Sequence, residues 1–133
     1  MIIDSSAVLA IFFREGGAEA LLSTIMDADF VGIGSPTAAE TGLVLTGRMK
    51  QNAAGSLLRF FQETGIEIVP FTDLHWQRAI DAYARFGKGR HPAALNFGDC
   101  MTYATAALAR QPLLCRGEDF RKTDLELVQT RTL

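Results

Sequence analysis

Residues 1–13 read Met-Ile-Ile-Asp-Ser-Ser-Ala-Val-Leu-Ala-Ile-Phe-Phe, and this stretch gives the first indication of the fold class. The apolar run Met1–Ile3 predicts a short strand that ends at an acid, Asp4. Val8–Phe13 then begins a helix, which we expect to end near Gly16. A strand that passes directly into a helix is the first half of a βαβ unit, so the rest of the chain decides whether a parallel sheet forms.

The remainder of the chain repeats this alternation of strand and helix. The expected helices are Ala18–Met26, 36–49, Ala53–Glu63, one from Thr72 through Phe86, and Phe97–Arg110. The expected strands are Phe30–Ile33, Ile66–Phe71, Leu113–Cys115 and, at the edge, Leu125–Val128. Strands separated by helices of about ten or more residues predict right-handed crossovers. The fold class is therefore α/β, a three-layer α/β/α sandwich with a mainly parallel central sheet.

Length and composition indicate one domain over residues 1–133. The chain is 48% hydrophobic and 21% charged, which is typical of a globular protein. Apolar runs such as Ala7–Phe13 stop well short of the ~18 residues that a membrane span needs, so we expect a soluble, unexported protein. Two cysteines, Cys100 and Cys115, are too few for a disulfide scaffold and fit a reducing cytoplasm.

Charge is distributed unevenly along the chain. The net charge of −2 argues against a protein that coats nucleic acid through bulk positive charge. However, residues 1–84 carry ten acids and five bases, whereas residues 85–133 carry eight bases and five acids. The C-terminal third is therefore the part that could contact phosphates, although each base could equally be a solvated surface residue. Its candidates are Lys88, Arg90, His91, Arg116, Arg121 and Lys122.

Two acids follow strands of the predicted sheet. Asp4 ends the first strand, and Asp119 follows the strand Leu113–Cys115 by four residues. In open α/β sheets the ligand crevice lies beyond the carboxyl ends of the strands, so these acids are expected there. Asp119 could also be an ordinary turn residue. Asp4 lies between an apolar strand and an apolar helix, so we expect it to be partly buried, where an unpaired carboxylate costs free energy.

Two further acids lie near the starts of helices. Ser35 before Pro36 is an expected N-cap, which places Glu40 in the first turn and a half of the following helix. Asn96 is the expected cap of the next such helix, with Asp99 three positions later. Either acid could simply satisfy the helix N-terminus and its dipole.

Together these four acids could point into one cleft. Two unit charges ~4 Å apart repel by about 4 kcal/mol at an effective dielectric constant near 20, so such a cluster needs a cation or bound protons. An all-oxygen donor set without a cysteine or histidine at ligand spacing favours Mg²⁺ or Mn²⁺ over Zn²⁺.

Other α/β proteins also gather acids at strand ends. A phospho-accepting receiver domain needs an acidic pair after the first strand, and a haloacid-dehalogenase-like phosphatase needs Asp-x-Asp. Both are disfavoured because Asp4 is followed by Ser5 and Ser6. A non-catalytic binding module, in which the acids only stabilise the fold, stays open.

Four segments carry a family resemblance: Met1-Ile-Ile-Asp-Ser-Ser-Ala7, Pro36-Thr-Ala-Ala-Glu40, Leu95-Asn-Phe-Gly-Asp-Cys100, and Pro112–Phe120 followed by Thr123-Asp124. In this order and spacing the chain resembles the PIN-domain ribonucleases, and more narrowly the VapC toxins of bacterial toxin–antitoxin pairs. The resemblance covers essentially the whole chain. It implies a PIN-like α/β/α fold, a Mg²⁺ or Mn²⁺ site, endonucleolytic cleavage of RNA, and inhibition by a cognate VapB antitoxin.

The resemblance also implies site residues. The three firmest acids of the family match Asp4, Glu40 and Asp99. We take Asp119 as the fourth and leave Glu118 open, because many relatives carry an additional Asp where this chain has Gly117. Asp4 and Asp99 are the expected direct metal ligands. Glu40 and Asp119 would act at a second metal position, through water, or as the acceptor of the water's proton. Ser6 matches a small polar position that supports the first acid or the scissile phosphate, or it only starts a helix.

Apolar residues in the early helices suggest a partner surface. Phe12-Phe13 and Leu21-Leu22 exceed what one inward-facing stripe requires. Exposed there, they would suit a homodimer or an antitoxin helix. Alternatively, they complete the core of a monomer.

Overall fold

Four short strands form one sheet at the centre of the molecule, in the order β3-β2-β1-β4. They are Ile2–Ile3 (β1), Gly32–Gly34 (β2), Glu67–Val69 (β3) and Leu113–Leu114 (β4). Every neighbouring pair is parallel, with Ile2 opposite Gly32 on one side and opposite Leu113 on the other. The computed structural model describes residues 1–130, and the predicted parallel sheet is confirmed in it.

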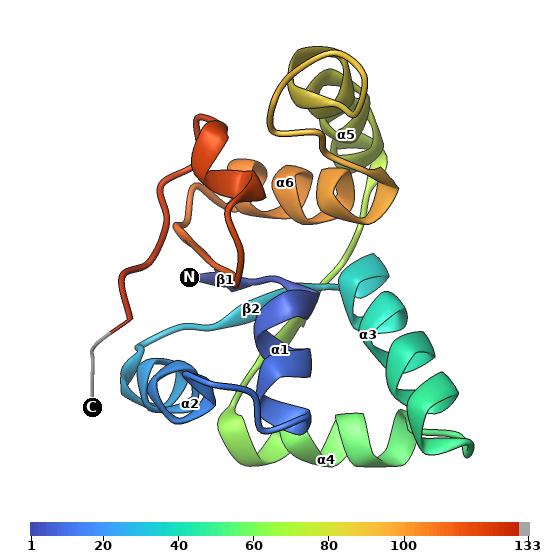
Figure 1. Cartoon of the computed structure of the whole chain (residues 1–133), viewed down its shortest axis with the longest axis vertical. Helices are drawn as coiled ribbons and strands as arrows, with labels where there is room; N and C mark the ends of the chain where they lie inside the picture. Colours follow the sequence, from blue (N-terminus) through green and yellow to red (C-terminus); the bar gives the residue numbers. More distant parts are fainter. Residues whose placement is uncertain (131–133) are drawn as a thin grey trace.

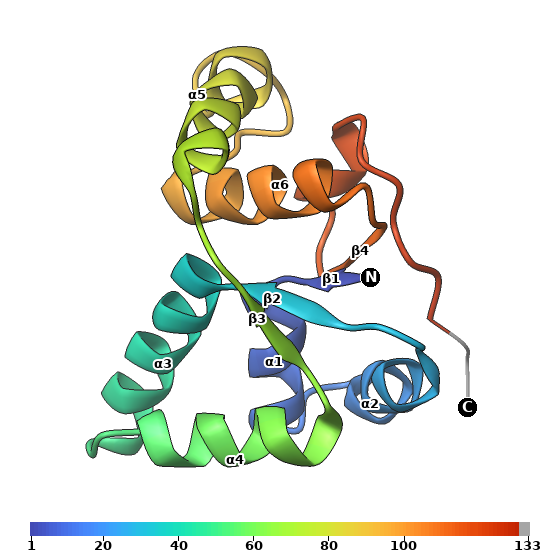
Figure 2. The same ribbon diagram turned by 180° about the vertical axis from the view of Figure 1, so that it is seen from behind.

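Helices cover both faces of this sheet, which confirms the three layers (Figures 1 and 2). The helices α1 to α4 lie on one side, and α5, α6 and the 3₁₀ turn η1 lie on the other. No helix within residues 1–130 is long and apolar enough to cross a membrane. The helices have the bounds Ser5–Phe12 (α1), Ala18–Asp27 (α2), Ser35–Met49 (α3), Ala54–Thr64 (α4), Asp73–Phe86 (α5), Phe97–Ala109 (α6) and Asp119–Lys122 (η1).

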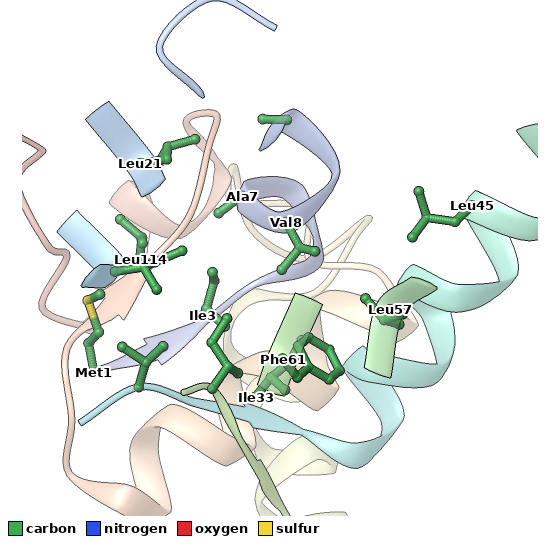
Figure 3. Close-up of a cluster of buried hydrophobic side chains, with 14 of the residues drawn as sticks. Met1, Ile3, Ala7, Val8, Leu21, Ile33, Leu45, Leu57, Phe61 and Leu114 are labelled. Atoms are coloured by element: carbon green, nitrogen blue, oxygen red, sulfur yellow. The ribbon is translucent and has the colours of Figure 1, made fainter. Parts of the chain in front are cut away.

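Successive strand residues contribute to two separate cores, because their side chains point to opposite faces of the sheet. Ile3 and Leu114 pack among the helices α1 to α4, in the cluster that Figure 3 shows. Ile2 and Leu113 pack against α5 and α6 instead. The two layers are therefore held to the same two strands from opposite sides.

The helices α1, α3 and α6 all begin at the carboxyl edge of the sheet. Asp4 caps α1, and Asn96 caps α6 as predicted. The predicted cap of α3 is wrong by one residue, since Gly34 is the N-cap and Ser35 is already helical. The reason is that the chain passes from β2 into α3 without an intervening loop residue.

Close contact with the sheet fixes the position of α6. A Cβ atom at Gly34 would lie 2.6 Å from Oγ1 of Thr105, so α6 packs directly on the end of β2. Because Thr105 lies in the C-terminal half of α6, this contact fixes the body of the helix on the sheet.

The predicted edge strand Leu125–Val128 is wrong as a full strand. Only Leu113 pairs with this segment, forming an isolated bridge to Leu127. The amide of Leu113 donates to the carbonyl of Glu126, and its own carbonyl accepts from the amide of Val128, both at 2.9 Å. The segment therefore forms a single bridge to β4 and not a ladder of consecutive pairs.

Candidate active site

Asp4 is a buried carboxylate that donors from two helices hold in place. Only 6% of the residue is exposed. Its Oδ2 accepts a hydrogen bond from the amide of Ser6 at 3.1 Å, and its Oδ1 accepts one from Oγ1 of Thr102 at 2.8 Å. Such bonds compensate the loss of hydration that burial causes.

A second hydroxyl extends this network into α3. Oγ1 of Thr37 lies 3.0 Å from Oγ1 of Thr102, and both residues are buried. Because Thr102 uses its single proton on Asp4, Thr37 must be the donor between the two threonines. The order is therefore Thr37 to Thr102 to Asp4, joining α3, α6 and the end of β1.

Neither threonine is among the predicted site residues, although the sequence contains a signal for both. Thr37 lies three residues before Glu40, and Thr102 lies three residues after Asp99. Residues three apart share a helix face, so each hydroxyl could have been placed beside an acid.

Glu40 reaches from α3 towards the starts of α1 and α6. Its Oε1 accepts a hydrogen bond from Oγ of Ser5 at 2.9 Å. Its carboxylate also lies against the backbone of Gly98, where a Cβ atom would be 2.1 Å from Oε2. Glu40 therefore lies over the turn that carries Asp99.

Asp99 links the acids electrostatically. It forms a capping box with Asn96, whose backbone amide donates to Oδ2 of Asp99 at 3.0 Å. Burial raises the pKa of Asp99 to about 6; the bond from Asn96 opposes the rise, and the charges of Asp4, Asp119 and Glu40 add to it. Asp4, Glu40 and Asp119 thus lie within electrostatic range of Asp99.

Asp119 and Glu118 have different surroundings. Asp119 is exposed at the start of η1, and its charge raises the pKa of Asp99. Glu118 instead pairs with Arg121 at 3.2 Å. Gly117 has a φ of +98°, a backbone conformation in which an aspartate at that position would be strained.

The donor set fits a divalent cation by chemistry, but its side chains are not arranged for coordination. Within residues 1–130, no three carboxylate, imidazole or thiol side chains form a group that could hold a metal ion. In the same part of the chain, none of the four acids pairs with a lysine or arginine. Hard oxygen donors whose charges lack a basic partner suit Mg²⁺ or Mn²⁺, and coordination would require side-chain rotation.

Ser6 and Arg116 connect the site to the loop after β4. Oγ of Ser6 accepts a hydrogen bond from the amide of Arg116 at 2.9 Å. The guanidinium of Arg116 pairs with Glu15. Ser6 therefore supports Asp4 through its amide and holds the loop through its hydroxyl.

Arg90 and His91 lie in the loop between α5 and α6 and contact α5. The guanidinium of Arg90 lies 5.8 Å from the centre of the Tyr83 ring. The ring of His91 meets Phe86 edge-on at 5.1 Å, and its Nδ1 accepts a bond from the amide of Ala93. These contacts give His91 a role in shaping the loop, and none of them joins it to the acids.

Of the apolar residues singled out on the early helices, Leu22 of α2 is exposed, together with Met26 on the same helix, whereas Leu21 is buried. Phe12 and Phe13 are partly buried against the core, with Phe12 packed on Phe60 of α4 at 5.1 Å. Further exposed apolar side chains lie on other elements. They follow α3 to β3 and α5 to α6, and include Leu43, Leu58, Ile68, Leu74, Trp76, Ile80 and Phe97.

Comparison with known proteins agrees with this architecture. Residues 1–126 match the family model of the PIN domain. Ribonuclease VapC36 of Mycobacterium tuberculosis is 46% identical over 127 residues, which cover 95% of this chain and 91% of that protein.

Two solved structures share the fold. The structure of Mycobacterium tuberculosis VapC20, described as a sarcin–ricin loop cleaving toxin, superposes with a TM-score of 0.77 at 15% identity and covers 96% of this chain and 98% of its own. The Rickettsia felis VapBC2 complex, bound to a DNA fragment from its promoter, has a TM-score of 0.72 at 17% identity and covers 96% of both chains. On the sequence match and the shared fold, the chain belongs to the PIN-domain family and, within it, to the VapC ribonucleases.

Proposed function

We propose that this chain is the toxin of a toxin–antitoxin pair and an endoribonuclease that depends on Mg²⁺ or Mn²⁺. The reaction is hydrolysis of RNA phosphodiester bonds at Asp4, Glu40, Asp99 and Asp119. The observation that carries this proposal is the convergence of acids from distant segments: Glu40 lies against Gly98 beside Asp99, and Thr102 of the same helix donates to Asp4. Burial, with a smaller contribution from the charges of Asp4, Asp119 and Glu40, raises the pKa of Asp99 to about 6. Perturbed groups of this kind gather at functional sites, and the curated relatives are named ribonucleases.

The acids have different tasks because their surroundings differ. Asp4 and Asp99 would hold the cation, since Asp4 is buried and fixed by Ser6 and Thr102. When bound, a divalent cation supplies a more acidic water and offsets negative charge on phosphate oxygens. Glu40 and Asp119 would orient water or accept its proton. Ser5 holds Glu40 for that task through the bond to Oε1.

RNA must approach a negatively charged site, so basic residues nearby matter. Arg121 and Lys122 extend from η1, the turn that begins with Asp119, and would contact phosphates on that side. Arg116 would contribute only after leaving Glu15. Arg90 and His91 would contact RNA farther along the strand, from the loop on α5.

Two partners are proposed in addition to RNA. Similar folds occur in the Rickettsia felis VapBC2 complex and in a toxin–antitoxin complex from Klebsiella pneumoniae, which supports a VapB-like antitoxin. The exposed apolar residues on α3 to β3 and on α5 to α6 supply surface for this antitoxin and for a homodimer.

The free thiols of Cys100 and Cys115 suit a reducing cytoplasm.

Cleavage assays test the proposal against a non-catalytic binding module. Purified protein is incubated with total RNA in Mg²⁺, in Mn²⁺ or in EDTA, with Asp4→Asn as the site variant. Asp29→Asn is the matched control, because Asp29 is exposed before β2, at the opposite edge of the sheet. We expect metal-dependent cleavage that falls by at least ~10²-fold in Asp4→Asn only. Absence of cleavage by wild-type protein under every condition would favour the binding module.

A further inference from the structure

We propose that Gly98 is a positioning residue for Glu40. Its missing side chain lets the Glu40 carboxylate lie on the first turn of α6, beside Asp99. Residue 98 thereby sets the distance between Glu40 and the other acids. The catalytic part of this inference rests on the proposed function, whereas the contact itself does not.

Three atoms of the Glu40 carboxylate occupy the space that a side chain at position 98 would take. A Cβ atom there would lie 2.1 Å from Oε2, 2.9 Å from Cδ and 3.1 Å from Oε1. Unbonded carbon and oxygen atoms do not approach to 2.1 Å, so the carboxylate would have to move by roughly 1 Å.

Backbone conformation does not explain a glycine at this position. Gly65 and Gly117 have positive φ values, but Gly98 has an ordinary helical conformation. Alanine has the higher helix propensity, so glycine here lowers helix stability. The steric need of Glu40 is therefore the local reason for glycine in the Asn96-Phe97-Gly98-Asp99 turn.

The displacement would also disturb the second contact of Glu40. Its Oε1 accepts the bond from Oγ of Ser5 at 2.9 Å, so the carboxylate is held between α1 and α6. A shift of about 1 Å away from α6 would stretch or break this bond. Reacting groups must be held to within roughly 0.5 Å, and a misplacement of ~1 Å can cost ~10²-fold in rate.

The chain offers a matched control at the same helix position. Gly98 is the second residue of α6, and Gly55 is the second residue of α4. A Cβ atom at Gly55 would meet nothing within 4 Å. Gly55→Ala thus reports the helix-propensity gain alone.

Thermal unfolding in EDTA tests the contact independently of any activity. Gly98→Ala is measured in the wild-type background and in Glu40→Ala, beside Gly55→Ala. We expect Gly98→Ala to raise the melting temperature by about 3–5 °C in Glu40→Ala, and by clearly less when Glu40 is present. Equal shifts in both backgrounds would overturn the proposal, even if the wild-type protein did not cleave RNA.

RNA cleavage and Mn²⁺ affinity test the positioning role. Gly98→Ala is expected to lose ~10²-fold in cleavage rate and to bind Mn²⁺ more weakly, while Gly55→Ala changes neither. Glu40→Asp shortens the side chain by one methylene and makes room for the added methyl group. Gly98→Ala should therefore cost little further activity in the Glu40→Asp background. A Gly98→Ala variant within threefold of wild type, or one whose loss is the same in both backgrounds, would show that residue 98 does not act through Glu40.

Discussion

Asp99→Asn should stabilise the metal-free protein at neutral pH. The substitution removes the charge of Asp99 but keeps a side-chain oxygen that can accept the bond from the amide of Asn96, so the cap of α6 is retained. Because this hydrogen bond from the backbone amide of Asn96 is kept, it does not contribute to the expected gain in stability. The expected effect comes from ending the burial of a charge and its repulsion by Asp4, Asp119 and Glu40.

The pKa of Asp99 sets the size and the pH dependence of this effect. The pKa is about 6 in the folded protein, against 3.8 for the ordinary carboxyl group. That difference corresponds to about 3 kcal/mol, and exposure to solvent reduces it to roughly 1–2 kcal/mol. The folded state binds the proton more tightly than the unfolded state, so the carboxylate destabilises the fold fully above pH ~6. The destabilisation disappears as pH falls towards 3.8.

Thermal unfolding of both proteins in EDTA, from pH 4 to pH 8, measures this effect directly. We expect Asp99→Asn to melt roughly 3–8 °C above wild type at pH 7.5, with most of the difference lost at pH 4. A variant that melts below wild type at pH 7.5, or a gain in melting temperature that does not depend on pH, would refute the conclusion that the Asp99 carboxylate destabilises the fold.

Three other variants or conditions have defined outcomes. Thr102→Val should lower RNA cleavage by tenfold or more and the free energy of unfolding by about 1–3 kcal/mol, because Asp4 loses a buried hydrogen-bond donor. Thr102→Ser should restore both, and failure of that rescue would contradict the hydroxyl network. Millimolar Mg²⁺ or Mn²⁺ should raise the wild-type melting temperature by mass action, and an unmoved midpoint would leave the acids without their cation. Tyr103→Phe removes a 2.6 Å bond to Asp124 and should cost about 1–2 kcal/mol in urea unfolding while cleavage is unchanged.

The fold was predictable because local signals mark most of its elements. Asn96 and Thr72 cap helices where they were expected, and the apolar runs at residues 1–3 and 113–115 contain the strands β1 and β4. Leu125–Val128 has the same apolar character, yet only its contact with Leu113 forms. Pairing at a sheet edge depends on the path of the chain, which hydropathy does not encode.

The candidate site was predictable to the level of its acids. A parallel sheet brings strand ends and helix starts to one edge, so Asp4, Glu40 and Asp99 could be placed together from their positions alone. The support for those acids was not predictable. Gly98 acts through a contact with a residue 58 positions away, and a threonine such as Thr102 is an ordinary helix residue until its partner is known.

The partner surface shows the limit of counting apolar residues. Phe12 exceeds the inward stripe of α1, but Phe60 of α4 packs against it. Which helix covers another depends on tertiary packing, so the excess apolar residues indicated a contact without showing whether it lies within the chain or between chains.

Mapping the ends of cleaved RNA shows whether this chain hydrolyses RNA with a metal-activated water. Wild-type protein, Asp4→Asn and Asp29→Asn are incubated with RNA in Mg²⁺ or Mn²⁺ and, separately, in EDTA. Hydrolysis by an activated water leaves a phosphate on one new end and a hydroxyl on the other. We expect such ends for wild type and Asp29→Asn with metal, and at least ~10²-fold less product from Asp4→Asn. Cyclic 2′,3′-phosphate ends, or cleavage that persists in EDTA, would contradict this mechanism.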